Sequence, residues 1–395
     1  MKIMLMFWLS AALCFLVDPA RAGDLEIAVA AYNGLAFQLL AQCRQSLPQT
    51  NFFLSPAGLA FALSMVQNGA QGETLRQIMA TLELSNLPPP RLNEANKALL
   101  DHLSKLDPTI KLEIANAIWI DQKASIKPDF ISVNRRAYDA EVGTGNFQDP
   151  ATVKTINAWV SARTHEKIPT ILEPPLDPSL RLILLDAIYF KGDWLAPFDP
   201  KLTRELPFTL GNGQTAPLPR MSHEGHYNYD EQNGFQAVEL PYVGGEISMF
   251  VFLPKGRLDE FLKTFTLADF DASFQPMRSL KGTVELPRFK LKNEYDLTRV
   301  LPPMGMPLAF TAQADFGALS DEPLFISFVK QKTYVAVNEQ GTEAAAVTGI
   351  AVAMAAVRRA EPPPFHFVVD RPFFMAIRER QTRLILFLGA ISDPR

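Results

Sequence analysis

The sequence predicts one large α+β domain, because segments with helical patterns fill the first half of the chain and segments with strand patterns fill the second. The two kinds of segment do not alternate strictly, and no clear linker separates them. This order is typical of an α+β domain with more than one β-sheet. With 395 residues, 48% of them hydrophobic, the chain can bury the large core that such a domain needs.

Apolar residues at helical spacing mark the segments of the first half. Ser55 followed by Pro56 has the form of an N-cap residue with proline at the first helical position, and it begins one of these helices. The predicted helices are 24–44, 56–67, 72–82, 91–106, 128–140 and 150–166.

Apolar or alternating runs mark the strands, most of which lie in the second half. Gly244-Gly245 separates two of these runs and predicts a hairpin turn. The predicted strands are 112–120, 180–190, 236–241, 247–253, 282–291, 325–338, 373–377 and 384–391.

The first 22 residues have the pattern of a secretory signal peptide. Lys2 gives the positive start, residues 3–17 are almost wholly apolar, and Ala20-Arg21-Ala22 has the small-x-small form of a cleavage site. We therefore expect cleavage after Ala22, which leaves residues 23–395 as a mature domain secreted to an extracellular or periplasmic space. The alternative is an uncleaved membrane anchor, for which residues 3–17 are short. After cleavage no membrane contact is expected.

Charge and cysteine content narrow the classes of partner and cofactor. The net charge of −4 argues against nucleic acid or another polyanion as the main partner. Cleavage would remove Cys14 and leave Cys43, which suits a core position on its Ala/Leu-rich helix and cannot form an intramolecular disulfide. His223-Glu-Gly-His226 has a spacing that two metal ligands could use, but no third ligand motif accompanies it. No metal or other cofactor is expected.

Residues 339–364 fit neither a helix nor an ordinary linker. Small apolar residues are frequent from 344 to 357, but Thr348, Gly349 and Ile350 disfavour a helix. Flexible linkers seldom carry so many apolar residues. In a strand, residues 342, 344, 346, 348, 350 and 352 would share one face. That face carries no charge and is small over its first four positions, so it could be buried against a core.

The segment Glu339-Gln-Gly-Thr-Glu-Ala-Ala-Ala346 resembles the hinge of inhibitory serpins. Other segments from about Asp24 to Pro394 resemble serpin signatures, in the order and spacing of that family. They are Asn51-Phe-Phe-Leu-Ser-Pro56, Asn68-Gly-Ala-Gln-Gly-Glu-Thr74, Leu112-Glu-Ile-Ala-Asn-Ala117, Ile156-Asn-Ala-Trp159, Ala187-Ile-Tyr-Phe-Lys-Gly-Asp-Trp194, Gly234-Phe-Gln-Ala-Val-Glu-Leu-Pro241, Pro287-Arg-Phe-Lys-Leu291, Asp370-Arg-Pro-Phe373 and Phe387-Leu-Gly389. By this resemblance the chain is identified as a member of the serpin family.

The resemblance implies a serpin fold with three β-sheets, eight or nine helices and an exposed reactive-centre loop at about 339–364. It also implies a metastable protease inhibitor, not an enzyme, that acts as a suicide substrate. A serine protease attacks the loop and forms an acyl-enzyme, and the freed arm then inserts as a new strand of the large sheet. The implied hinge residues are Glu339, Gly341, Thr342, Glu343, Ala344, Ala345 and Ala346.

A non-inhibitory serpin, acting as a binding or carrier protein or as a plain substrate, is the alternative. The small hinge residues favour inhibition, because non-inhibitory relatives often carry bulky or charged residues there.

The usual length of an inhibitory loop in the family places the reactive bond between Ala355 and Ala356. Small residues at this bond suit elastase-like or subtilisin-like proteases, which have shallow pockets. The alternatives are Met354, and Arg358 or Arg359, which would suit a trypsin-like protease but need a longer arm. A cysteine protease is a further candidate target, and the inhibitor is expected to be a monomer.

The resemblance also assigns a sheet-opening cluster. In many relatives Ser, Ser, Asn and His meet where the large sheet parts, and the matching positions here hold Ser55, Gly58, Asp186 and Gln331. Asp in place of Asn exchanges a donor–acceptor amide for a group that only accepts when ionised, although Gln331 can donate to it. Trp194 matches the family's tryptophan at the top of the same sheet.

Overall fold

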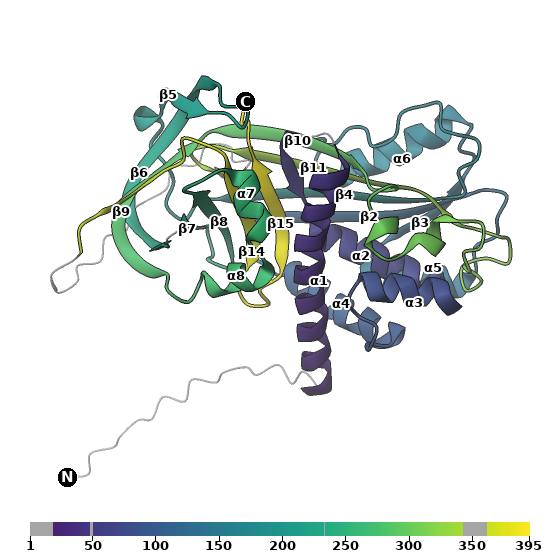
Figure 1. The fold of residues 1–395 in the computed structure, drawn as a ribbon. Coiled ribbons are helices and arrows are strands. Elements are labelled where there is room, and N and C mark those ends of the chain that lie inside the picture. Colours follow the sequence, from purple (N-terminus) through teal and green to yellow (C-terminus); the bar gives the residue numbers. More distant parts are fainter. Residues whose placement is uncertain (1–18, 48–49, 233, 343–361) are drawn as a thin grey trace, which may run out of the picture.

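A computed structural model of the chain describes residues 19–47, 50–232, 234–342 and 362–395. In these residues the chain forms eight α-helices and two hydrogen-bonded β-sheets, of six and nine strands. Figure 1 shows the two sheets side by side, with the first helix, α1 (Pro19–Ser46), crossing between them.

The six-stranded sheet forms one side of the molecule. Its strands, in spatial order, are β10 (Phe289–Asp296), β11 (Ile326–Val337), β12 (Gly341–Thr342), β4 (Leu182–Asp193), β2 (Lys111–Asp121) and β3 (Glu141–Gly145). β4 and β11 also pair directly, and they run parallel to each other. Figure 1 shows α6 (Pro150–Arg163) along one face of this sheet, where Val153, Ile156 and Val160 are buried. The opposite face packs on α2 (Pro56–Val66), all of whose residues are buried.

The nine-stranded sheet consists of two parts that share one long strand, β6 (Thr215–Glu231). β6 pairs with β7 only at Tyr229–Glu231, whereas its remaining length pairs with β5 and β9. One part is formed by β1 (Phe52–Leu54), β15 (Ile385–Ile391), β14 (Phe373–Glu379), β8 (Ile247–Pro254) and β7 (Phe235–Pro241). The other is formed by β5 (Arg204–Thr209), β6, β9 (Arg278–Pro287) and β13 (Phe365–Val368). With the six-stranded sheet, these parts give the three-sheet serpin fold that the resemblance implied, and that prediction is confirmed.

The remaining helices cover the sheets and close the core. α3 (Gly72–Thr81), α4 (Pro89–Leu103) and α5 (Pro128–Tyr138) lie near α2, and α7 (Leu258–Thr264) and α8 (Leu267–Ala272) lie over the nine-stranded sheet. The side chain of Ser55 accepts a hydrogen bond from the Gly58 backbone N–H and caps α2, as the Ser-Pro pair predicted. Cys43 of α1 is fully buried in the hydrophobic core of the domain, also as predicted.

One predicted strand is wrong. The alternating run 282–291 was expected to form a single strand, but it divides at Arg288 into β9 and β10, which belong to different sheets. The Arg288 N–H still donates to the Pro219 carbonyl oxygen, in register with the β6–β9 ladder, but Pro219 has no backbone N–H to return a hydrogen bond, so the ladder ends there. The side-chain alternation continues through this break, so hydrophobic periodicity does not reveal it.

The predicted signal peptide lies mostly outside the described residues, which begin at 19. The backbone at the expected cleavage site after Ala22 lies in the first turns of α1, so cleavage there would shorten that helix from Pro19 to Gly23. Among the residues described, none of the helices has the length and apolar character that crossing a membrane requires. Cleavage and secretion therefore stay predictions.

Candidate functional site

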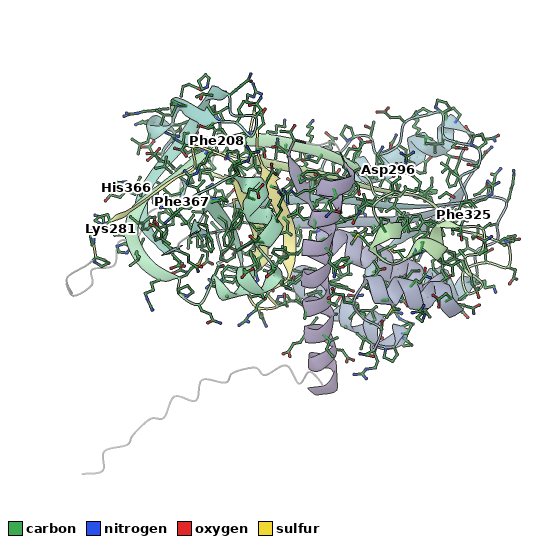
Figure 2. The ribbon with its side chains drawn as sticks, viewed as in Figure 1. Phe208, Lys281, Asp296, Phe325, His366 and Phe367 are labelled. Carbon is green, nitrogen blue, oxygen red and sulfur yellow. The ribbon has the colours of Figure 1, made fainter. Side chains whose placement is uncertain are left out.

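The ends of the predicted reactive-centre loop attach to two different sheets. Glu339, Gly341 and Thr342 lie at the end of the six-stranded sheet where β4 finishes and β12 begins. We call this the upper end of the sheet. After Pro364 the chain continues as β13, which pairs in parallel with β9. Figure 2 shows His366 and Phe367 of β13 beside Lys281 at one end of the molecule, and Phe325, just before β11, at the other.

The predicted residues between these two ends lie outside the described part of the chain. They are the hinge residues Glu343, Ala344, Ala345 and Ala346 and the reactive-bond candidates Met354, Ala355, Ala356, Arg358 and Arg359.

The contact between β4 and β11, which we call the β4–β11 seam, is the feature of this sheet that bears on function. The two strands pair in parallel from Ile326↔Leu182 to Tyr334↔Tyr189. At the upper end of the seam, β12 lies between them and runs antiparallel to both, with Thr342 opposite Gly192 of β4 and Val337 of β11. An antiparallel strand can hydrogen-bond to a parallel neighbour on each side, so the seam already holds the first two residues of such a strand.

Aromatic side chains hold the upper end of the seam. The indole of Trp194 stacks on Tyr242 with ring centroids 4.6 Å apart, and its Nε1 donates to the Asn338 carbonyl oxygen at 2.9 Å. The Trp194 backbone N–H donates to the Gln340 carbonyl oxygen at 2.7 Å. Tyr242 in turn shares a 2.7 Å hydrogen bond with the hydroxyl of Thr342, which is fully buried. Trp194, which the resemblance assigned to the top of this sheet, thus contacts the backbone that leads into β12.

The backbone of β4 leaves no room for a side chain at Gly341. A Cβ on Gly341 would lie 2.1 Å from the Gly192 carbonyl oxygen and 2.7 Å from the Cα of Asp193. Both are backbone atoms and cannot rotate away. Glu339 is buried and accepts a hydrogen bond from the Thr203 hydroxyl at 2.8 Å, with Arg288 at 3.5 Å from the same carboxylate oxygen. Glycine at 341 is therefore required by the close approach of β12 to β4.

The four predicted sheet-opening residues come together lower on the seam, against α2. Gln331 of β11 donates from Nε2 to Asp186 of β4 at 2.6 Å and to the Ser55 carbonyl oxygen at 2.8 Å. Its Oε1 accepts from the Ser55 backbone N–H at 3.1 Å. Gly58 faces the same cluster, because a Cβ there would lie 2.4 Å from the Asp186 carboxylate and 2.1 Å from Ile188. Gln331 thus joins both strands of the seam to the start of α2.

Asp186 carries the unusual chemistry of this cluster. Burial raises its pKa to about 8, and the hydrogen bond from Gln331 only partly opposes this rise. At neutral pH the side chain is therefore mainly a neutral carboxylic acid, which can donate as the amide of asparagine would. Among the residues described, its Oδ1 has no hydrogen-bond partner, and the same holds for Oδ1 of Asn116 directly across on β2.

Two members of this site, Asn116 and Tyr242, were not predicted from the sequence. Asn116 is a polar residue within a buried strand, and that mismatch was a usable signal. Its Nδ2 donates to the Gly58 carbonyl oxygen at 3.1 Å and joins β2 to the same cluster. Tyr242 follows a predicted strand directly, and neither periodicity nor a motif indicated that it would reach Thr342.

The paired histidines of β6 do not form a metal site. Residues three apart in a strand point to opposite faces, so His223 and His226 cannot both ligate one ion. His223 contacts the Tyr227 hydroxyl and is half-buried, and burial lowers its pKa. In the part of the chain that the structure describes, no group of three or more His, Cys, Asp or Glu side chains could hold a metal.

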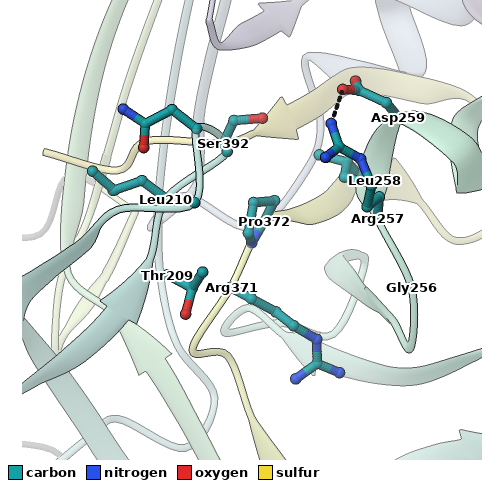
Figure 3. Close-up of a pocket in the computed structure, with 12 residues that line it drawn as sticks. Thr209, Leu210, Gly256, Arg257, Leu258, Asp259, Arg371, Pro372 and Ser392 are labelled. Carbon is teal, nitrogen blue, oxygen red and sulfur yellow. Dashed lines mark ion pairs between the residues drawn. The ribbon is translucent and has the colours of Figure 1, made fainter.

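A pocket of about 430 Å³ lies apart from the seam, where the β5–β6 turn meets the start of α7 and the residues just before β14. Figure 3 shows the Arg257–Asp259 ion pair at this pocket. Asp259 also forms an ion pair with Arg44 at 2.8 Å. Arg371 donates to the Pro254 carbonyl oxygen and pairs with Asp370. These arginines connect the loops around the pocket, so we assign the pocket to the scaffold and not to the functional site.

Comparison with known proteins agrees with the geometry. The family model for serpins, serine protease inhibitors, matches residues 30–394. Iripin-8 of Ixodes ricinus is 34% identical over 98% of this chain and 99% of its own length, and the leukocyte elastase inhibitor of Bos taurus is 34% identical over 92% and 99%. The structure of human thyroxine-binding globulin superposes with a TM-score of 0.86 at 26% identity, over 94% of this chain and 99% of that one. The chain belongs to the serpin family of serine protease inhibitors.

Proposed function

We propose that this chain is a secreted inhibitor that traps a serine protease as a covalent acyl-enzyme and inserts its cleaved loop into the six-stranded sheet. The observation that carries the proposal is the β4–β11 seam. It pairs two parallel strands directly, yet it already holds Gly341 and Thr342 as the start of an antiparallel strand between them. The apolar segment of residues 3–17 and the motif ending at Ala22 support secretion.

The register of β12 gives the path of insertion. Thr342 is opposite Gly192 and Val337, so each later residue would lie opposite the preceding position of β4 and of β11. Thr342 points into the core, and strand alternation would direct residues 344, 346 and 348 to the same side. These are Ala, Ala and Thr, which fit a buried face without a charge.

Insertion would also supply the energy that inhibition needs. At about 1 kcal/mol net for each hydrogen bond, a new central strand of roughly a dozen residues would release on the order of 10 kcal/mol. The protease serine would attack the carbonyl carbon of Ala355, the peptide bond to Ala356 would break, and the new amine would take a proton. The attached protease would then be pulled with the inserting arm, and a small displacement of its catalytic groups costs about a hundredfold in rate. Deacylation would stall.

The candidate targets follow from the residues at the bond. Ala355 and Ala356 suit an elastase-like or subtilisin-like pocket, and the likeness to a leukocyte elastase inhibitor supports that class. Cleavage at Arg358 or Arg359 would suit a trypsin-like protease and would require the seam to accept a longer arm. The inhibitor is proposed to act as a monomer.

A second candidate function is that of a carrier, because human thyroxine-binding globulin has a closely similar fold. In that case the loop would be cleaved without trapping the protease. The buried Thr342 and the close packing of Gly341 favour insertion, because both suit a strand between β4 and β11.

The test is to mix the mature protein with elastase, subtilisin, trypsin and papain and to run denaturing gels. A band that resists denaturation at the summed mass supports the covalent trap. Mass spectrometry of the released C-terminal peptide locates the bond and distinguishes Ala355 from Arg358 or Arg359. Clean cleavage by every protease, with no covalent complex, refutes the trap and leaves the carrier function.

A further inference from the structure

A positively charged pocket lies on the α6 side of the six-stranded sheet, away from the hinge and the sheet-opening cluster. It has a volume of about 280 Å³, and it is lined by residues 167–170, 292–294 and 332–334. The lining contains three lysines, Lys167, Lys292 and Lys332, and one carboxylate, Glu294. This local excess of positive charge stands against a chain whose net charge is −4.

The single carboxylate of the pocket already serves two lysines. Glu294 pairs with Lys332 at 2.6 Å and with the neighbouring Lys330. Burial opposes its ionisation, but hydrogen bonds from these two lysines lower the pKa of Glu294 below its usual value. The carboxylate is therefore ionised at neutral pH, and with three lysines against this one carboxylate the pocket carries a net positive charge.

Further ammonium groups converge on the base of the pocket, the nearly buried ring of Tyr334. The Nζ atoms of Lys290, Lys292 and Lys167 lie 5.5, 6.0 and 5.9 Å from the ring centroid. Neither Lys290 nor Lys292, both exposed strand residues, has an ion-pair partner within the described ranges. Lysines so close together repel one another, and a bound anion would relieve that repulsion.

The pocket joins the segment after α6 to β11. Residues 167–170 follow α6, and Ile168 is buried in one cluster with α6, β2 and β4 on one side of the seam and with Tyr334 of β11 on the other. Lys292 and Lys332 lie on β10 and β11, and the lining of the pocket contains no residue of β4. Lys332 already donates to the Thr170 carbonyl oxygen at 2.8 Å. A ligand held by Lys167 and Lys332 would strengthen the tie between the segment after α6, which packs over β2 and β4, and β11, the strand that must move away from β4 for a new strand to enter.

We infer that this pocket binds a small oxyanion, a free or esterified phosphate or sulfate, through Lys167, Lys292 and Lys332, and that the bound anion holds the β4–β11 seam closed. Lysine ammonium groups bind such tetrahedral anions through charge-assisted hydrogen bonds. The Thr170 hydroxyl can supply a further donor. The effect on seam opening rests on the proposed function, whereas the binding itself does not.

Calorimetric titration of the whole purified protein tests the site, with inorganic phosphate, inorganic sulfate and glucose 6-phosphate as probes at low ionic strength. Saturable binding is expected, and Lys292→Gln should weaken it about tenfold, as expected for one lost charge-assisted hydrogen bond. Lys154→Gln, which removes an exposed lysine on α6, is the matched control and should leave the affinity unchanged. Comparison of the three probes shows whether a free or an esterified anion is preferred.

Two outcomes would overturn the anion site: none of the probes binds, or Lys292→Gln binds them as the unchanged protein does. The effect on the seam is measured separately, as the rate of covalent complex formation with a trapped protease. Saturating anion should slow that rate, and Lys292→Gln should lose the slowing. An unchanged rate refutes the effect on opening, while failure to trap any protease refutes the proposed function and leaves the calorimetric result standing.

Discussion

The two ends of the β4–β11 seam are built in opposite ways. At the upper end, Thr342 has entered between the strands, and its hydroxyl bonds to Tyr242 in the core. Lower down, β4 and β11 pair directly, and Gln331 bonds to Asp186 across them. The upper end is thus a place where a strand has started, and the lower end is a polar lock that its continuation would have to break. If the cleaved loop inserts as proposed, the contacts that resist opening are therefore those of Gln331 and Asp186, below the hinge.

The largest expected effect is at the upper end, from Thr342→Arg. The site is fully buried, so the variant must place an unpaired charge in the core or keep β12 out of the seam. We expect covalent complexes to disappear and cleavage to continue, so that the inhibitor becomes a substrate. Denaturing gels with the trapped protease measure this directly. Thr342→Ser keeps the hydroxyl for Tyr242 and should still form complexes, and trapping by Thr342→Arg would contradict insertion along this path.

Gly341→Ala should destabilise the native protein by about 1–3 kcal/mol, the usual cost of overpacking. The added methyl would meet the backbone of Gly192 and Asp193, so β12 has to move away from β4. The measurement is the melting temperature of the uncleaved protein. Gly256→Ala is a suitable control, because a Cβ there has no atom within 4 Å. Equal melting temperatures for the two variants would show that β12 does not lie closely against β4.

The two strands of the seam could be predicted from the sequence, but their pairing could not. The strands predicted at 180–190 and 325–338 became β4 and β11 with small shifts at their ends, because long apolar runs are strong local signals. No local signal shows that these two strands are parallel neighbours, since the pairing joins residues more than 140 positions apart, such as Asp186 and Gln331.

Only part of the candidate site could be predicted, because its members also meet through contacts between distant parts of the chain. Asp186 and Gln331 were found through the family resemblance, which carries information on tertiary contacts. Asn116 was not found, because a polar residue in an apolar strand shows that it needs a partner but does not name one. The break at Arg288 was missed because side-chain alternation continues through it.

Asp186 should make stability depend on pH at the lower end of the seam. Its pKa is raised by burial to about 8 in the folded protein, against about 4 for an unfolded chain, so the folded state binds the proton more tightly. Its contribution to stability is complete below about pH 4, declines as pH rises toward about 8, and is lost above that value. The decline is at most about 1.4 kcal/mol per pH unit.

Asp186→Asn should remove this decline. Melting temperatures at pH 5 and pH 8 should therefore differ less in the variant than in the unchanged protein. Asp321→Asn, at a largely exposed aspartate, controls for the loss of one carboxylate and should keep the full difference. If Asp186→Asn melts with the same pH dependence as the unchanged protein, Asp186 is not the group that links stability to pH.

The smallest expected effect is that of Thr348→Val, at a position that insertion would bring to the lower end of the seam. Extending the register of β12 by six residues places Thr348 opposite both Asp186 and Gln331, whose mutual hydrogen bond insertion must break. A hydroxyl at that position can donate to one and accept from the other, which replaces the lost bond. Thr348→Val has a similar shape without the hydroxyl, and it should cost the cleaved, inserted form about 1 kcal/mol more than it costs the uncleaved form. Denaturant unfolding of both forms measures the difference, and an equal loss in both would place Thr348 outside the inserted row.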